Sequence, residues 1–279
     1  MELQLELEER TGLQSVSVTR YQQGERRMVD DVVAREVPLE VRFNGRTLAR
    51  LMRLPGDEVL LAAGHCLSEG LISDREQLEF IRHRCGGYPE PFGERPSGGE
   101  GEGGLREPAT GDLVEVEART RHGAGREGTG GEADVTGIRV DSEARFPTGV
   151  IEKAPGFLLE GQEVFRATGG THAAGIFNAA GEVLVIKEDI GRYSAVDKAL
   201  GHLLLSGEPA SDKGIVLSGR LFGEMVLKCA RAGIPLVCSI SAPTARGVEV
   251  GRETGVTLVG FLRGSSFNVY SHPERIGAP

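Results

Sequence analysis

The sequence predicts an α/β (overall α+β) protein of two parts, a small β-rich part over residues 1–145 and a larger α/β part over residues 146–279. Three observations predict this fold class. Before residue 54, apolar and polar residues alternate in short runs, which is the period of half-buried strands. After residue 160, continuous apolar runs alternate with stretches of helical spacing, which favours βαβ units and a mainly parallel sheet. Between them, residues 86–131 hold 14 glycines in 46 residues. We expect a flexible, disordered insertion there, because so few apolar groups cannot offset the entropy of ordering.

The β-rich part is expected to consist of strands joined by tight turns, with one helix. Asn44-Gly45 stands between two of the alternating runs and predicts a hairpin turn. Pro55-Gly56-Asp57 then opens a helix with Asp57 as its N-cap, and Gly70 is suited to end that helix. The strands predicted for this part are 13–18, 37–43, 47–51, 113–117 and 136–140.

The larger part is expected to alternate strands with helices. The predicted strands are 184–186, 214–217, 234–240 and 256–262, and the predicted helices are 194–205, 222–231 and 244–253. The run Ile215-Val216-Leu217 is apolar throughout, which is typical of a strand buried on both faces. In such sheets, ligands bind beyond the carboxyl ends of the strands. The residues that follow the strands are therefore the candidates for a binding site.

Composition and charge exclude several classes of protein. The 279 residues carry 32 basic and 41 acidic side chains, a net charge of −9, with 5% aromatic residues and no tryptophan. We expect no nucleic-acid partner, which would require a basic face or an aromatic platform. No apolar run approaches the length of a membrane span, and residues 1–10 are acidic rather than a signal peptide, so we expect no membrane association. The expected location is the cytoplasm, with the four cysteines as reduced thiols.

Small, hydroxyl-bearing and basic residues follow the expected strands of the larger part. These segments are Glu188, Asp189 and Arg192; Ser218, Gly219 and Arg220; Ser241, Pro243 and Thr244; and Arg263, Gly264, Ser265 and Ser266, with Gly169, Gly170, Thr171 and His172 before the first strand. Loops of this kind at one sheet edge predict a pocket for a diphosphate, in which arginines donate to phosphate and the acidic pair accepts from ribose or a base.

Each loop also has a purely structural interpretation. Glycines are common in short connections, and Thr244 could be an ordinary N-cap. His172 fits a hydrogen-bonded structural residue as well as a catalyst. Zinc is not expected, because zinc deaminases need H-x-E followed by P-C-x-x-C. Here Ala173-Ala174 follows the histidine, Pro243 is followed by Thr244-Ala245, and the sequence has no C-x-x-C pair.

An ordered series of motifs runs through both parts of the chain. The motifs are Glu36-Val37-Pro38-Leu39, Phe43-Asn44-Gly45-Arg46, residues 62–70, residues 168–174, residues 188–192 with Asp197-Lys198, residues 218–220, residues 241–244, residues 258–263 and residues 268–270. Together they resemble the FdhD family, the accessory sulfurtransferases of formate dehydrogenase, over residues 32–83 and 160–275.

The resemblance implies a fold, a cargo and partners. It implies a cytidine-deaminase-like three-layer α/β domain without zinc, and a family homodimer. It implies that molybdenum (or tungsten) bis(molybdopterin guanine dinucleotide) is bound as cargo. Sulfur would pass from a cysteine desulfurase to that metal before the cofactor is inserted into formate dehydrogenase. The family's cofactor-contacting segment corresponds to Phe261, Leu262, Arg263, Gly264, Ser265 and Ser266.

One feature departs from the family pattern. The family carries C-x-x-C in a loop before the T-G-G-x-H block, and the stretch 145–162, where that loop is expected, has no cysteine. Sulfur transfer needs a reachable thiolate. Cys85 is the catalytic candidate, because it stands at the mouth of the glycine-rich segment with Arg82, His83 and Arg84. Its alternative interpretation is a free cysteine that ends a helix.

Three functions remain open from the sequence. The first is a sulfurtransferase that uses Cys85 or another route, since Cys66, Cys229 and Cys238 lie in apolar patterns and are expected in the core. The second is a cofactor-binding chaperone without sulfur chemistry. The third is a hydrolase or deaminase that acts on a nucleotide in the same pocket, although zinc ligands and a Ser-His-Asp pattern are lacking.

Overall fold

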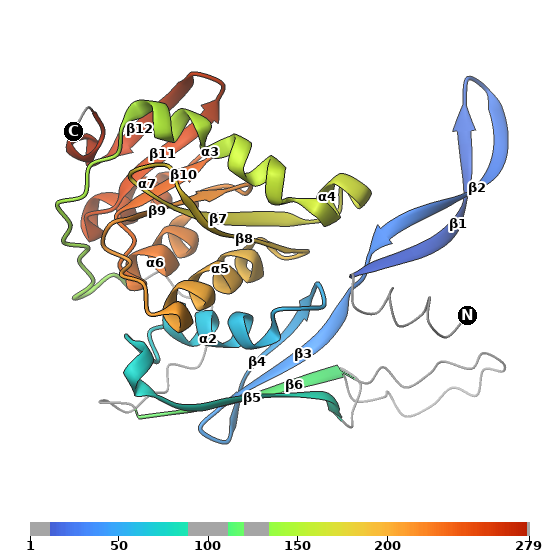
Figure 1. Cartoon of the computed structure of the whole chain (residues 1–279), viewed down its shortest axis with the longest axis horizontal. Helices are drawn as coiled ribbons and strands as arrows, with labels where there is room; N and C mark the ends of the chain where they lie inside the picture. The colour runs from blue at the N-terminus through green and yellow to red at the C-terminus, as the bar shows by residue number, and fades with distance from the viewer. Residues whose placement is uncertain (1–11, 89–110, 120–133, 278–279) are drawn as a thin grey trace.

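The computed structural model describes residues 12–88, 111–119 and 134–277, and Figure 1 shows their arrangement. A six-stranded sheet and a four-stranded sheet lie on opposite sides of a helical layer. Strands β1 (Leu13–Gln22) and β2 (Glu25–Ala34) form a separate antiparallel arm that projects from the body. No helix in the described ranges is long and apolar enough to cross a membrane.

The four-stranded sheet has the order β4-β3-β6-β5. Its strands are β3 (Val37–Phe43), β4 (Arg46–Arg53), β5 (Leu78–Tyr88) and β6 (Gly111–Ala118). Asn44 and Gly45 turn the β3–β4 hairpin with φ of 48° and 76°, left-handed values that an Asn-Gly pair accommodates. Helix α2 (Glu58–Ser68) packs on this sheet, and the short helix η1 (Arg75–Gln77) leads into β5. The predicted turn and the predicted strands 37–43, 47–51 and 113–117 are confirmed.

The six-stranded sheet has the order β12-β11-β10-β9-β7-β8. Its strands are β7 (His172–Asn178), β8 (Val183–Asp189), β9 (Lys213–Leu217), β10 (Leu236–Ser239), β11 (Thr257–Arg263) and β12 (Ser266–Ser271). The neighbours β9, β10 and β11 are parallel, whereas the pairs β7–β8, β7–β9 and β11–β12 are antiparallel. The prediction of a mainly parallel sheet is therefore wrong, because three of the five neighbouring pairs are antiparallel. Residues 179–182 and 264–265 are too few for the crossovers that parallel pairing needs.

Helices cover both faces of the six-stranded sheet. They are α3 (Thr148–Gly161) on one face and α5 (Arg192–Ser206), α6 (Gly223–Arg231) and α7 (Ala245–Thr254) on the other. The short helix α4 (Glu163–Thr168) lies against β2, and η2 (Pro273–Arg275) is near the end of the chain. Successive side chains of a strand point to opposite faces. On β9, Ile215 and Leu217 join the cluster formed with α5, α6 and α7, whereas Val216 packs with the buried residues of α3. The larger part thus has three layers, as predicted.

Helices α2 and α5 approach until their main chains touch. A Cβ atom on Gly64 would lie 1.7 Å from the Asp197 carbonyl oxygen, and one on Gly201 would lie 1.9 Å from the Leu60 carbonyl oxygen. Only glycine allows this separation. One core cluster consequently runs from the four-stranded sheet through α2 and α5 into the six-stranded sheet.

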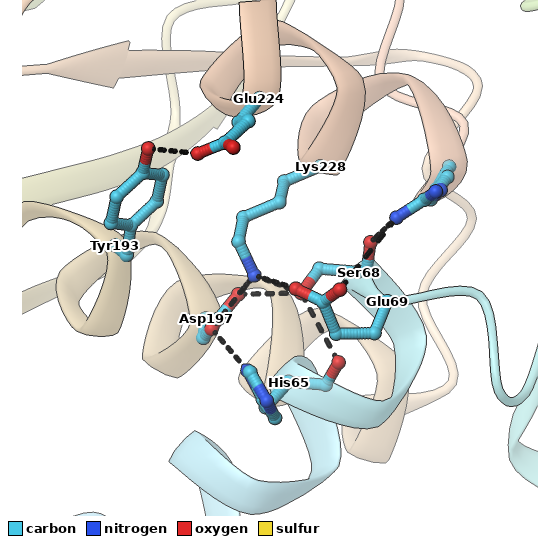
Figure 2. A network of polar contacts seen from close by, with 8 residues as sticks. His65, Ser68, Glu69, Tyr193, Asp197, Glu224 and Lys228 are labelled. Carbon is cyan, nitrogen blue, oxygen red and sulfur yellow. Dashed lines mark hydrogen bonds and ion pairs between the residues drawn. The ribbon is translucent and has the colours of Figure 1, made fainter. Parts of the chain in front are cut away.

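A buried set of charges fastens α2 to α5 and α6 (Figure 2). We call it the junction network; its members are His65, Ser68, Glu69, Asp197 and Lys228. The Asp197 carboxylate accepts from Ser68 Oγ at 2.7 Å and from Lys228 Nζ at 3.2 Å, and it lies 3.1 Å from His65 Nδ1. Lys228 also donates to Glu69 at 2.8 Å.

The junction network holds its two central groups in their charged forms. Burial acts to raise the pKa of Asp197, but the Lys228 ammonium and His65 outweigh it, so the pKa lies below its ordinary value. Burial acts to lower the pKa of Lys228, but Asp197 and Glu69 outweigh it, so that pKa is raised. A buried pair of this kind is costly to break, because the remaining charge would lack a partner.

Two predicted elements are wrong. Residues 136–140 form a turn and irregular chain rather than a strand, and the Val140 N–H donates to the Thr254 carbonyl of α7 instead of to a neighbouring strand. The stretch 145–162, interpreted as a loop, is mostly the helix α3. Its buried residues Ile151, Ala154 and Leu158 recur at helical spacing, and this amphipathic pattern was the missed signal.

Two details of the smaller part also differ from expectation. Asp57 occupies the N-cap position of α2, but with φ of 62° its side chain makes no capping bond and instead pairs with Lys187 at 3.0 Å. Cys85 lies in β5, so it does not end a helix. Most of the predicted insertion, 86–131, lies outside the described residues.

Candidate functional site

The six-stranded sheet brings the predicted segments to one edge. Strands β8, β9, β10 and β11 end at this edge, and the antiparallel strands β7 and β12 begin there. Asp189 pairs with His172, and Ser266 pairs with Arg263. We call the following group the edge site: His172, Arg192, Ser218, Gly219, Arg220, Ser241, Phe261 and Arg263.

His172 and Ser218 are in direct contact. Ser218 Oγ lies 3.2 Å from His172 Nδ1 and accepts the Ala173 N–H at 2.9 Å. Burial and the nearby Arg192 guanidinium both lower the pKa of His172. The imidazole is therefore neutral at pH 7, and its Nδ1 can accept the serine proton.

Arg192 and Gly219 lie against this pair. A Cβ atom on Gly219 would be 3.5 Å from Arg192 Cβ and 3.9 Å from His172 Nδ1, so the main chain after β9 passes close to both residues. The exposed Arg192 guanidinium stacks over the rings of Tyr193 and Phe222, at 5.1 Å and 4.9 Å from their centres. These contacts hold the exposed guanidinium in place at the edge, where it can donate to an anion.

The two aromatic residues that stack with Arg192 were not predicted from the sequence. Tyr193 also donates a short hydrogen bond to Glu224, and burial followed by that carboxylate raises the pKa of the tyrosine. A signal was available, because Tyr193 directly follows Arg192 and Phe222 opens the helix after the Ser-Gly-Arg loop.

Glu188 is engaged with the protein rather than open for a ligand. Its carboxylate accepts the N–H groups of Val164 and Phe165 in the first turn of α4, at 2.9 Å and 2.8 Å. It also accepts the Thr171 hydroxyl at 2.7 Å. Glu188 thus ties the Thr-Gly-Gly-Thr segment to the edge site. Gly169 ends α4 with φ of 67° and, like Gly170, is exposed.

Asp189 connects the two parts of the protein. It is fully buried and forms an ion pair with Lys198 at 2.8 Å. It accepts the Leu54 N–H at 3.2 Å, and Lys198 donates to the Leu54 carbonyl at 3.0 Å. Burial raises the pKa of Asp189, although Lys198 acts against that rise. The loop after β4 is thereby fixed directly behind the edge site.

Backbone strain marks the end of β11. Phe261 has φ of 52° and is 40% exposed, and its N–H donates to the Ser241 carbonyl at 2.9 Å. Left-handed conformations of bulky residues are costly and occur often at functional sites. The Arg263 guanidinium lies 5.9 Å from the centre of the Phe261 ring. Pro243 packs on Gly260, where a Cβ atom would lie 2.9 Å from its ring.

The remaining predicted residues have three different surroundings. Arg220, Gly264, Ser265 and Ser266 are exposed at the edge. Leu262 is fully buried in the core under α3, so its side chain does not face the edge. Thr244 caps α7 by accepting the Gly247 N–H at 3.2 Å, which is the structural interpretation of that residue.

The cysteines differ sharply in accessibility. Burial raises the pKa of Cys66 and of Cys229 to about 12, and it raises the pKa of Cys238 as well. Those three thiols are buried, whereas Cys85 is exposed. Among the described residues, one group of three His, Cys, Asp or Glu side chains is close enough to share a metal ion. It consists of His83, Cys85 and Asp112 and does not include His172.

Comparisons with known proteins identify the same family as the sequence motifs. The model of the FdhD/NarQ family matches residues 34–277. A protein named sulfur carrier protein FdhD from Sulfurisphaera tokodaii is 39% identical over 252 residues, 88% of this chain and 92% of the relative. A relative with the same name from Nocardia farcinica is 39% identical over 258 residues, 88% of each chain.

A solved structure gives the same result. The crystal structure of a protein described as a formate dehydrogenase accessory protein, from Desulfotalea psychrophila, matches this fold with a TM-score of 0.72 and 27% identity. The match covers 95% of this chain and 99% of that chain. The resemblance inferred from the motifs is confirmed.

Proposed function

Because this chain belongs to the FdhD/NarQ family, we propose that it serves formate dehydrogenase as a sulfur carrier. The observation that carries the proposal is the extent of the match. It spans residues 34–277 and so includes the edge site, Cys85 and the junction between the two parts. The match covers 92% and 88% of the lengths of the two relatives with this name.

The cargo proposed for the edge site is molybdenum bis(molybdopterin guanine dinucleotide). Such a molecule presents diphosphates and planar guanines. Arg192, Arg220 and Arg263 are exposed there and can donate in pairs to phosphate oxygens. The exposed ring of Phe261, beside Arg263, offers a face on which a base can stack. The donor set therefore fits the dinucleotide portion of the cargo.

The proposed carrier thiol is Cys85, loaded by a cysteine desulfurase. It is the exposed thiol among the four cysteines, and thiolate character is what sulfur exchange requires. The second candidate function is a cofactor-holding chaperone without sulfur chemistry. The absence of a C-x-x-C pair from the sequence favours it. The family resemblance also supports a cytidine-deaminase-like domain without zinc, a homodimer and a cytoplasmic location as proposals.

Guanosine diphosphate is expected to bind the edge site, and Arg263→Ala is expected to weaken that binding. Loss of a charge-assisted contact costs about 1.5–3 kcal/mol, which corresponds to roughly 10-fold to 100-fold in Kd. Isothermal titration calorimetry on the full chain measures the change. Arg252→Ala is the matched control, because Arg252 is exposed in the last turn of α7, at the other end of that helix from Thr244. Equal affinities for the two variants would contradict the assignment of the edge site.

Cys85 is expected to gain one sulfur atom when the protein is incubated with a cysteine desulfurase and cysteine. Intact-mass spectrometry should show the adduct in wild-type protein and in the buried-cysteine control Cys66→Ala. It should be absent from Cys85→Ser. An adduct that persists in Cys85→Ser would place the carrier elsewhere. No adduct on any cysteine, with nucleotide binding retained, would favour the chaperone function.

A further inference from the structure

Three reactive side chains meet on one face of the four-stranded sheet. His83 and Cys85 are two residues apart on β5, which is the spacing of side chains on the same side of a strand. The pairing of β5 with β6 becomes irregular after Arg84. On β6, Val114 pairs with His83, and Asp112 lies two residues before it on the same side. The ligating atoms of His83, Cys85 and Asp112 all lie within 4.8 Å of one another.

A buried arginine holds the carboxylate of this cluster. Arg53, with only 1% of its side chain exposed, bonds through Nη2 to Asp112 Oδ2 and pairs with Glu58 at 3.0 Å. His83 Nε2 lies 3.3 Å from the same Asp112 oxygen, a close contact that is not a hydrogen bond. The order of groups is therefore arginine, carboxylate, imidazole and thiol, from the interior to the surface.

The arginine has donor capacity left over. Arg53 Nε and Nη1 are buried and have no hydrogen-bond partner among the described residues. An unsatisfied buried donor is costly, and more so when it is charged. Arg53 therefore keeps two N–H groups beyond the one that holds Asp112 and Glu58.

We infer that His83, oriented by Asp112 and Arg53, is the acid–base catalyst that makes Cys85 accept and release sulfane sulfur. Nucleophilic thiols are activated in this way by an adjacent base that a third group orients. The inference rests on the proposed sulfur-carrying function and adds to it the residues that perform the proton transfers. Asp112 and Arg53 are positioning residues, since they act through the imidazole.

The exchange balances without an oxidant or reductant. A persulfide R–S–SH is the donor. His83 takes the proton of the Cys85 thiol, and the thiolate attacks the outer sulfur of the donor. The Cys85 Sγ–S bond forms as the S–S bond of the donor breaks. The electron pair leaves on R–S⁻, which takes the proton back from the imidazolium, so that Cys85–S–SH and R–SH result.

Charges around the cluster favour proton transfer over metal binding. A divalent cation shared by these three side chains would lie beside the Arg53 guanidinium, which already occupies Asp112 Oδ2. Among the described residues, Arg53 from β4 contacts the cluster through Asp112, and Glu58 from α2 pairs with that arginine. Arg84 points to the other face of β5, where it pairs with Glu115 at 3.0 Å.

The test is the rate of Cys85 alkylation by iodoacetamide, measured from pH 5 to pH 9 on the full chain. His83→Gln is expected to slow alkylation near neutral pH by roughly 100-fold, the lower range for a positioned general base, and to change the shape of the pH profile. Asp112→Asn should change the profile in the same direction by less. Arg84→Gln, on the opposite face, should match wild type. Melting curves establish that each variant is folded.

The outcomes separate this inference from the proposed function. A His83→Gln profile that coincides with wild type would overturn the role of His83, whether or not Cys85 carries sulfur. An altered profile with no sulfur adduct in wild type would support the acid–base pair and reject the sulfur carrier. Stoichiometric zinc uptake by wild type that is lost in His83→Gln would overturn the inference in favour of a metal site.

Discussion

Replacing Gly201 with alanine is expected to destabilise the folded chain by about 3 kcal/mol, the upper end of the usual cost of overpacking. The added Cβ atom would lie 1.9 Å from the Leu60 carbonyl oxygen and 2.9 Å from the Gly64 nitrogen. These are main-chain atoms of a neighbouring helix, which cannot rotate away as a flexible side chain can. Helices α2 and α5 would have to separate, and the core that joins the two sheets would open with them.

Gly156→Ala is the matched control for this substitution. Gly156 also lies within a helix, α3, but a Cβ atom there would meet nothing within 4 Å. Alanine is favoured over glycine in a helix by roughly 1 kcal/mol, so this variant should be slightly more stable than wild type. Urea denaturation followed by circular dichroism measures both. Similar midpoints for Gly201→Ala and Gly156→Ala would show that the two helices are not held in main-chain contact.

Asp197→Asn is expected to cost about 3–5 kcal/mol, the usual penalty for removing one partner of a buried ion pair. The Lys228 ammonium would remain in the interior, with Glu69 as its only acidic partner in the junction network. Glu69→Gln is the control. It removes the other carboxylate of the same lysine, but that side chain is 40% exposed, so the loss should stay below about 1 kcal/mol.

The pH dependence of this difference follows from the direction of the pKa shift. The pKa of Asp197 is lowered in the folded chain, because Lys228 and His65 outweigh its burial. The stabilisation is therefore complete above the unfolded-state pKa, near 4 for an aspartate, and is lost as the pH falls through the lower folded-state value. The stability gap between wild type and Asp197→Asn should accordingly narrow below about pH 4. A gap that stays constant down to the acid transition would mean that Asp197 does not titrate with folding.

Most secondary structure of the larger part could be predicted from the sequence. The apolar run at Ile215–Leu217 and the stripe beginning at Ala195 correspond to β9 and α5, because periodicity is a local property. Strand β7 was missed, since its glycine and alanines resemble a loop. Helix α3 was missed because Pro155 and three glycines obscure its amphipathic pattern. In both cases tertiary burial overrides weak local preference.

The candidate site divides in the same way. Most residues of the edge site could be named from the sequence, because strand ends of one direction must meet at one edge of a sheet, whereas Phe261 was named from the family resemblance. The engagement of Glu188 with α4 could not be predicted, nor could the burial of Asp189. Both depend on which neighbouring element places a hydrogen-bond donor beside the carboxylate, and spacing along the chain carries no information about that.

The sequence by itself determined the family, the order of strands and helices from β8 to β11, and the choice of Cys85 over the cysteines in apolar runs. The tertiary structure alone decided what surrounds Cys85. Arg53 and Asp112 are 59 positions apart, yet the Arg53 guanidinium donates to the Asp112 carboxylate oxygen that lies beside His83. It likewise decided the union of the two parts through Gly64 and Gly201. The physical reason is common to both: contacts between distant segments are set by packing and charge pairing in three dimensions, whereas periodicity reports only on neighbours.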